Sequence, residues 1–406
     1  MFSRTKDNFK KIEQMNCRVC KKKKLKKIIN FGNFPVCHKF RNKNQRDKKY
    51  SLQIGICKSC KLVQLSNLFP VKQLKPKYNW INYNEPEEHL DSLVKKISKL
   101  KNINKESIIA GVSYKEISTL KRFKDNGFDK NWILDMKKDL NIQDSKSNLE
   151  TIQEKISKIN IKKIINKKKK ADVLIVRHIL EHSYDTINFI NSLKGLINDE
   201  GYLIFEVPDC NESLVSSDYT SIWEEHILYF TENTLKQLLI NQGLKIIHFE
   251  KYEYSYENVL IVVAKINKDQ YLRKKKNKTL PKINFNLISL AKDKNKVRNK
   301  IKKFRNENYK ICLFGTGHAA CTFLNILKLH DLIDIVVDDD KNKTNLFLPN
   351  SNLQIKKSSN LKKLDKVLLI LGVNSESEKK IIIKSKKISS KIKFFSIYNK
   401  SRFSFK

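Results

Sequence analysis

Two matched Cys-x-x-Cys pairs constrain the fold of this chain more than any other feature. Cys17 and Cys20 form the first pair, and Cys57 and Cys60 form the second. Each pair, held in a tight turn, can coordinate one tetrahedral ion through two thiolates, and two pairs complete a closed site of four thiolates. The segment between the pairs can fold as a hairpin, so the sequence predicts a structural zinc site. A redox motif or buried free thiols are the alternatives.

The remaining cysteines fit a packed core better than a metal site. Cys210, Cys312 and Cys321 lie in or beside apolar runs, and Cys37-His38 follows Phe34-Pro35-Val36, which is typical of ordinary packing. The first residues of the chain lack the apolar region of a secretory signal, and no stretch is long enough for a membrane span. We therefore expect a cytoplasmic protein with reduced thiols and no membrane partner.

The length of 406 residues exceeds what one hydrophobic core usually holds, so several domains are expected. Changes in composition and in predicted secondary structure divide the chain into four parts. They are a zinc-binding domain, a first domain of alternating strands and helices, a Lys- and Asn-rich linker helix, and a second domain of alternating strands and helices. Their predicted ranges are 1–72, 73–265, 266–305 and 306–406. The predicted fold class is α/β, with two Rossmann-like doubly wound domains preceded by a small four-cysteine zinc-binding domain.

The net charge of +41 permits two interpretations, a nucleic-acid binder or a compositional drift toward lysine. A nucleic-acid groove would concentrate the basic residues on one element and interleave aromatic side chains. Here the lysines are scattered over the whole chain, which favours drift. Nucleic acid is therefore not an expected partner, whereas an anionic small molecule such as a nucleotide diphosphate is compatible with the charge.

The first α/β segment has the order of a nucleotide-binding unit. Ser107–Gly111 is a predicted strand that ends in a turn, a helical pattern leads to Gly127, and Trp132–Asp135 is the next predicted strand. In such units the glycine turn lets the backbone approach the ligand, and the terminal acid accepts hydrogen bonds from ribose. Because Gly111 is the single glycine of its turn, a plain βαβ unit is an equal alternative.

Histidines follow the next predicted strand, Ala171–Val176. His178 and His182 come directly after it, and His226 lies further along, beside Glu225. Ligand chemistry in open α/β sheets gathers at the carboxyl ends of the strands. A neighbouring carboxylate can raise the basicity of an imidazole and fix its tautomer, as a general base requires. A structural histidine in a polar cluster is the alternative.

The C-terminal segment repeats the strand, glycine turn and helix pattern. Phe314-Gly315-Thr316-Gly317 follows a predicted strand, and Ile335–Asp338 is the next strand with a terminal acid. This turn predicts either a nucleotide site or a domain that packs against its neighbour.

Taken in order, these segments resemble the sugar C-methyltransferase family over nearly the whole chain. The similar segments are the two cysteine pairs, Ala171–His182, Trp223-Glu224-Glu225-His226 with Tyr229-Phe230, Lys310–Gly317 and Val336-Val337-Asp338. The resemblance implies S-adenosylmethionine as cofactor, structural zinc, and methylation of the carbon beside the ketone of a nucleotide-linked deoxyketosugar.

The resemblance also implies roles for single residues. His226 would remove the proton beside the ketone, Glu225 would orient His226, and His182 would hold or polarise the sugar. Tyr78 would match an active-site tyrosine. The cofactor would contact Gly111, Asp135 and His178, and the substrate would contact Glu224, Gly315 and Gly317.

Three departures from the family pattern are visible, and one is the replacement of the family's Gly-Gly-Ser segment near Tyr254-Ser255-Tyr256-Glu257-Asn258. The loop Gly111–Glu116 has no second glycine, and Trp223 and Glu224 replace the tyrosine and the first histidine of the family signature. A changed substrate is therefore expected. The alternatives are a non-catalytic methyltransferase-like protein and a zinc-ribbon protein that binds nucleic acid.

Overall fold

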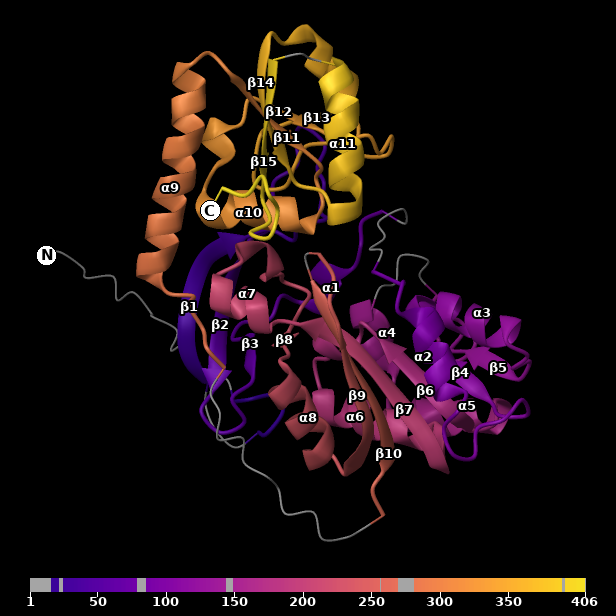
Figure 1. The fold of residues 1–406 in the computed structure, drawn as a ribbon. Helices are drawn as coiled ribbons and strands as arrows, with labels where there is room; N and C mark the ends of the chain where they lie inside the picture. Colours follow the sequence, from indigo (N-terminus) through magenta and orange to yellow (C-terminus); the bar gives the residue numbers. More distant parts are fainter. Residues whose placement is uncertain are drawn as a thin grey trace, which may run out of the picture.

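Three β-sheets organise the part of the chain that the structure describes, and each is built mainly from a different part of the sequence (Figure 1). The computed structural model describes residues 16–21, 25–78, 85–143, 149–255, 257–268, 281–388 and 391–405. The predicted α/β fold class, with a four-cysteine region ahead of two α/β domains, is confirmed. Of the predicted linker 266–305, residues 269–280 lie outside the described part.

The N-terminal sheet is antiparallel and has the strand order β1-β2-β3-β8. Its strands are β1 (Leu25–Phe34), β2 (Tyr50–Cys57), β3 (Val63–Leu65) and β8 (Leu228–Tyr229), and the short helix α1 (Val71–Leu74) follows β3. β8 comes from the central part of the chain, where it directly follows the His226 segment. This strand therefore fastens the His226 segment to the cysteine-bearing sheet.

The central sheet has the strand order β5-β4-β6-β7-β10-β9. β4 (Ile109–Gly111), β5 (Asn131–Ile133), β6 (Ala171–Arg177) and β7 (Ile197–Asp209) are parallel, whereas β10 (Asn258–Ile266) runs antiparallel between β7 and β9 (Leu244–Tyr252). The continuous apolar run of β6 is explained by burial on both faces. Leu174 and Val176 enter one core cluster, and Val173 and Ile175 enter the other.

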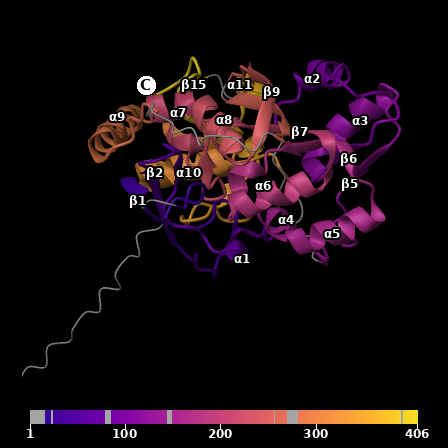
Figure 2. The same cartoon turned by 90° about the horizontal axis from the view of Figure 1, so that it is seen from below.

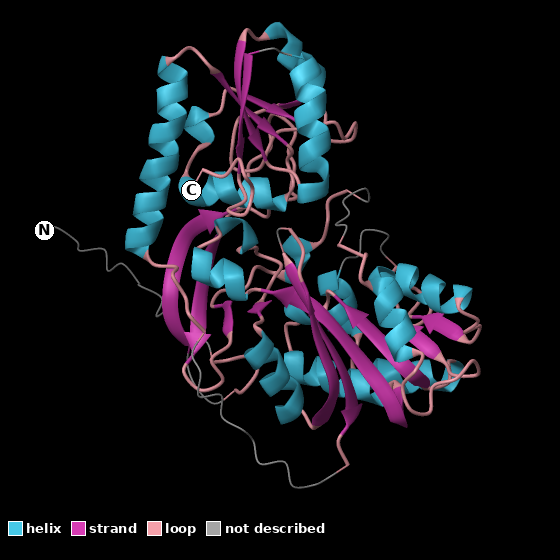
Figure 3. Cartoon of the chain, in the orientation of Figure 1, coloured by secondary structure: helices cyan, strands magenta, loops and turns pink. Residues whose placement is uncertain are grey.

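Helices cover both faces of the central sheet (Figure 3). They are α2 (Leu90–Ile97), α3 (Ile117–Asp125), α4 (Leu149–Lys155), α5 (Lys158–Lys167), α6 (Thr186–Gly195) and α8 (Glu232–Asn241). The short helix α7 (Asn211–Ser216) packs instead through Leu214 into the core shared by the N-terminal and C-terminal sheets. In α2, Leu90, Leu93, Val94 and Ile97 are buried, which is the spacing of one helix face.

The C-terminal sheet is parallel throughout, with the strand order β13-β12-β11-β14-β15. Its strands are β11 (Lys310–Phe314), β12 (Ile335–Val337), β13 (Ile355–Lys356), β14 (Lys366–Leu371) and β15 (Lys391–Ser396), and its helices are α9 (Leu287–Asn306), α10 (His318–Leu327) and α11 (Ser375–Ile388). Figure 2 shows α9 at the opposite side of the molecule from α3. The strand, glycine turn and helix order predicted after Lys310 is present in this sheet.

A buried charge network lies where β6 and β7 end. The Arg177 side chain donates from Nε to Glu206 Oε2 at 2.6 Å and from a terminal nitrogen to Glu206 Oε1 at 3.0 Å. His178 Nε2 lies 2.9 Å from Glu206 Oε1, and the Arg177 backbone N–H donates to Glu116. Because Arg177 and Glu206 are fully buried, each charge depends on the other for compensation.

We expect Arg177→Met to lower the free energy of unfolding by about 3–5 kcal/mol, because it leaves the buried Glu206 carboxylate without its main counter-charge. Urea unfolding of the zinc-loaded protein measures this change. Arg298→Met is the control, since Arg298 pairs with exposed Asp331 away from this network and should cost under about 1 kcal/mol. Equal small effects of both substitutions would contradict the prediction.

Candidate active site

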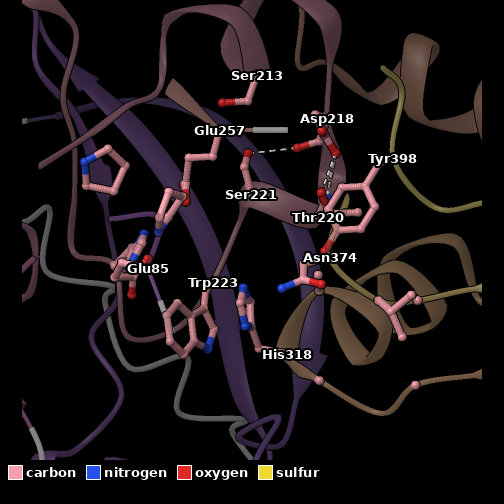
Figure 4. A pocket seen from close by; sticks show the side chains of 18 of the residues that line it. Glu85, Ser213, Asp218, Thr220, Ser221, Trp223, Glu257, His318, Asn374 and Tyr398 are labelled. Carbon is pink, nitrogen blue, oxygen red and sulfur yellow. Dashed lines mark hydrogen bonds between the residues drawn. The ribbon is translucent and has the colours of Figure 1, made fainter. Parts of the chain in front are cut away.

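A cavity of about 1300 Å³ lies between the central and C-terminal sheets. The carboxyl ends of both sheets border it, through His178 and His182 after β6, Asp209 at the end of β7, Gly315 after β11 and Asn374 after β14. Figure 4 shows the residues of this cavity from close by. Strand ends are where ligands bind in open α/β sheets, so this cavity is the candidate active site.

Four aromatic rings form one cluster on the cavity wall. The ring centroids of His182 and His226 are 4.8 Å apart with perpendicular planes, and Trp223 lies 4.8 Å from His226. His318, the first residue of α10, stacks on Trp223 at 4.1 Å, and the two rings face each other in Figure 4. The cluster therefore joins the histidines of the central domain to the glycine turn of the C-terminal domain.

Burial controls the charge state of these histidines. It lowers the pKa of His226 well below its usual range, and neighbouring His182 and His318 lower that pKa further. Burial likewise lowers the pKa of His318 to about 4. His178 differs, because the carboxylates of Glu85, Glu181 and Glu206 outweigh the cost of burial and raise its pKa to about 10. Neutral imidazoles at His226 and His318 thus border the same cavity as an imidazolium at His178.

His178 also has an unusual backbone conformation. Its φ is +47°, in the left-handed region, which costs a residue other than glycine about 1–3 kcal/mol. Its backbone N–H donates to the Glu206 carbonyl at 2.9 Å. This strained residue lies on the cavity wall.

The two carboxylates before His226 contact the N-terminal domain. Glu225 Oε1 lies 3.0 Å from His38 Nε2, which also hydrogen-bonds the Leu74 carbonyl at 2.8 Å. Glu224 is buried, and its Oε1 accepts a hydrogen bond from the Cys37 backbone N–H at 2.5 Å. Glu225 borders the cavity beside His226. The contacts of Glu224 indicate that it holds the segment, whereas the sequence predicted that it contacts substrate.

The predicted cofactor residues separate into two groups. His178 lies on the cavity wall, together with Tyr114, Lys115 and Met136, which follow β4 and β5, and with Leu149 at the start of α4. Gly111 and Asp135 are not among the described residues that border the cavity. Asp135 is exposed, and its Oδ1 accepts hydrogen bonds from the backbone N–H groups of Lys137 and Lys138. A β-carbon at Gly111 would lie 2.6 Å from the β-carbon of Glu116, so the glycine accommodates this buried side chain.

The C-terminal glycine turn borders the cavity as predicted for a substrate site. Gly315 has φ +92°, and a β-carbon there would meet the Gly372 carbonyl at 2.8 Å, so both the conformation and the space require glycine. Gly317 precedes α10 and has open space where a β-carbon would point. Asp338, the acid after β12, accepts hydrogen bonds from the Thr316 side chain at 2.6 Å and from Lys343 at 3.0 Å.

Several cavity residues were not predicted from the sequence. Tyr78 was predicted from the sequence and borders the cavity. Glu85, His318 and Glu257 border it as well, but they were not predicted. Burial raises the pKa of Glu257 to about 7, and the nearby Glu85 carboxylate contributes to this increase. His318 had one sequence signal, its position directly after the Gly315–Gly317 turn. His38, which contacts Glu225, had none beyond its adjacency to Cys37.

The four predicted zinc ligands lie together. The Sγ atoms of Cys17 and Cys60 are 3.5 Å apart, as are those of Cys20 and Cys57, and all four lie within 4.8 Å of one another. Zn–S bonds of about 2.3 Å in a tetrahedron place sulfurs about 3.8 Å apart, so the cluster fits zinc. Gln64 supports it, because its amide donates to Cys17 Sγ at 3.2 Å.

Two parts of the chain match known protein families. Residues 17–74 match the Methyltransf_13 model, a zinc binding domain, and residues 283–395 match the model of a C-methyltransferase C-terminal domain. A search of curated proteins finds no match. The two domain matches confirm the predicted enzyme class, a methyltransferase, and the predicted zinc site. The predicted methyl donor, S-adenosylmethionine, agrees with that class.

Solved structures give weaker likenesses. An O-methyltransferase family protein from Burkholderia thailandensis is 11% identical, with a TM-score of 0.29 over 45% of this chain and 59% of its own. The 1,6-didemethyltoxoflavin-N1-methyltransferase of the same organism, solved with S-adenosylhomocysteine, is 9% identical, with a TM-score of 0.30 over 45% and 78%. Scores this low support no inference about substrate. Within the described residues, no helix combines the length and hydropathy of a membrane span.

Proposed function

We propose that this methyltransferase transfers a methyl group to the carbon beside the ketone of a nucleotide-linked sugar. The observation that carries the proposal is the pair of imidazoles, His182 and His226, on the wall of a cavity between two α/β sheets. A carbon beside a ketone is acidic enough for a positioned imidazole to remove its proton. The cavity, at about 1300 Å³, has room for a donor and a nucleotide-linked acceptor together.

The donor would lie near the ends of β4, β5 and β6. Met136 and Leu149 offer an apolar wall for an adenine ring. Lys115 Nζ and Glu85 Oε1, paired at 2.9 Å, offer opposite charges for the carboxylate and ammonium groups of an amino acid. S-adenosylmethionine supplies a methyl group that its sulfonium activates for attack by carbon. Gly111 and Asp135 are not among the described residues of the cavity, so no donor contact is proposed for them.

The acceptor would lie across the aromatic cluster. His226 takes the proton from carbon on its unprotonated ring nitrogen, and His182 and Tyr78 hold the sugar beside it. The diphosphate would follow Gly315 and Gly317, where the N-terminus of α10 offers backbone N–H groups. Glu225, tied to His38, keeps the His226 segment in place. Alignment of donor, carbon and base supplies most of the rate.

Calorimetric titration of the zinc-loaded protein with S-adenosylmethionine tests the donor site. We expect binding with a dissociation constant on the order of micromolar. Lys115→Met should weaken it about 10- to 100-fold, because it removes a charge-assisted hydrogen bond. Lys121→Met is the control, since Lys121 lies on the exposed face of α3 and pairs with Asp125. No binding to the folded, zinc-loaded protein would contradict the proposal.

His38 is predicted to act through Glu225. His38→Leu removes the ring nitrogen that lies 3.0 Å from the buried Glu225 carboxylate, and we expect kcat to fall about tenfold or more. The KM for S-adenosylmethionine should not change, because His38 is not among the described cavity residues. His38→Gln retains an N–H donor and should recover much of the activity. Equal losses in both variants would rule out this positioning role.

A further inference from the structure

Glu181 has an unusual environment for a carboxylate. It lies on the short turn Leu180–His182 after β6, and only 1% of its surface is exposed. Among the described residues, neither carboxylate oxygen has a hydrogen-bond partner. The imidazolium of His178 forms an ion pair with Glu181, but its Nδ1 lies 3.6 Å from Oε1, which is too far for a hydrogen bond. The buried carboxylate therefore has a counter-charge but no hydrogen-bond donor, which leaves its oxygen lone pairs available to a metal.

Two imidazoles face this carboxylate. One donor atom from each of Glu181, His182 and His226 lies within 4.8 Å of the other two. The backbone links the segments, because the N–H of Ile227, next to His226, donates to the Glu181 carbonyl at 2.9 Å. The three side chains are therefore held together by the fold, although His226 is distant from the other two in sequence.

We propose that Glu181, His182 and His226 form a second metal site, separate from the four cysteines, for a divalent transition metal such as Zn²⁺ or Co²⁺. Two imidazoles and one carboxylate are a common ligand set for such ions. Metal–nitrogen and metal–oxygen bonds of about 2.0–2.2 Å require ligand atoms about 3.3 Å apart, so the site closes by about 1.5 Å at most. His182 and His226 border the cavity, which leaves the other coordination positions open to it.

Metal binding at this site would regulate methyl transfer, an inference that rests on the proposed role of His226. The nitrogen lone pair that accepts a proton from carbon is the same lone pair that binds a metal. An occupied site therefore has no free base at His226. Excess Zn²⁺ or Co²⁺ is expected to inhibit methyl transfer reversibly, while the zinc held by the four cysteines supports the fold.

Titration of the zinc-loaded, full-length protein with Co²⁺ tests the site directly, because bound Co²⁺ has visible absorption bands that report its ligands. We expect one additional equivalent to bind, and methyl transfer to fall with the same midpoint. Glu181→Gln should weaken Co²⁺ binding more than about 100-fold, since losing even a group that supports a ligand costs about 10- to 100-fold. The comparison uses metal affinity and not basal methyl transfer, because the Glu181 carboxylate also raises the pKa of His178 on the cavity wall.

Glu200→Gln is the matched control, because Glu200 is exposed and pairs with Lys265 and Lys268. Its Co²⁺ binding should equal that of the unaltered protein. Absence of a second equivalent, equal affinity in Glu181→Gln, or activation by Co²⁺ would each overturn the inference. The absorption titration needs no substrate. Failure of methyl transfer is therefore distinguishable from failure of metal binding.

Discussion

Replacing His226 with glutamine is expected to reduce kcat for methyl transfer by about 10²- to 10⁴-fold, the range that a general base contributes. Glutamine retains a polar side chain of similar reach but cannot accept the proton from carbon. The fold should survive, because His226 is only partly buried and its neighbours Trp223 and Ile227 keep their backbone hydrogen bonds.

Steady-state kinetics and solvent deuterium exchange measure the two parts of this prediction. The intact enzyme should exchange the proton beside the ketone for deuterium, and His226→Gln should not. Binding of S-adenosylmethionine should persist in the variant. His248→Gln is the control, because His248 lies on the exposed part of β9 and pairs with Glu250. Normal kcat and exchange in His226→Gln would assign the base to another residue.

Cys57→Ser is expected to abolish zinc binding and to reduce kcat for methyl transfer about as much as His226→Gln does. The coupling is structural. Gln64 donates to Cys17 Sγ, and its backbone pairs with Leu228 of β8, two residues after His226. Loss of the zinc therefore loosens the strand that holds the catalytic segment. Structural zinc contributes about 10–16 kcal/mol in small domains, so the N-terminal domain should also unfold at a lower temperature.

Zinc content, thermal unfolding and kcat measured on the same preparation check this second prediction. Cys312→Ala is the control, because Cys312 is a buried core cysteine on β11 that contributes no zinc ligand. It should retain zinc and activity. A zinc-free Cys57→Ser protein with normal kcat would show that the β3–β8 pairing does not depend on the metal.

The parts of the fold with local signals could be predicted from the sequence. The cysteine pairs have a spacing that suits a tetrahedral ion, and their Sγ atoms do lie together. The apolar run of β6 and the glycine turn at Gly315 likewise combine a strand signal with a backbone requirement. Each of these features depends on residues close together in the chain.

The contacts of the site residues depend on distant parts of the chain and could not be predicted in the same way. Glu225 is adjacent to His226 in sequence, yet its carboxylate lies against His38 of the N-terminal domain. Asp135 follows β5 in the position of a ribose ligand, but its carboxylate accepts hydrogen bonds from the next turn. The two-residue strand β8 pairs with β3, and nothing in its own sequence specifies that partner.

The position of the transferred methyl group in the product tests the central claim most directly. The zinc-loaded protein would be incubated with a nucleotide-linked ketosugar and S-adenosylmethionine carrying a ¹³C-labelled methyl group, and the product examined by NMR. Our account predicts a labelled methyl bonded to the carbon beside the ketone, with loss of the proton from that carbon. A label on oxygen or nitrogen, or no transfer by protein that binds both ligands, would contradict it.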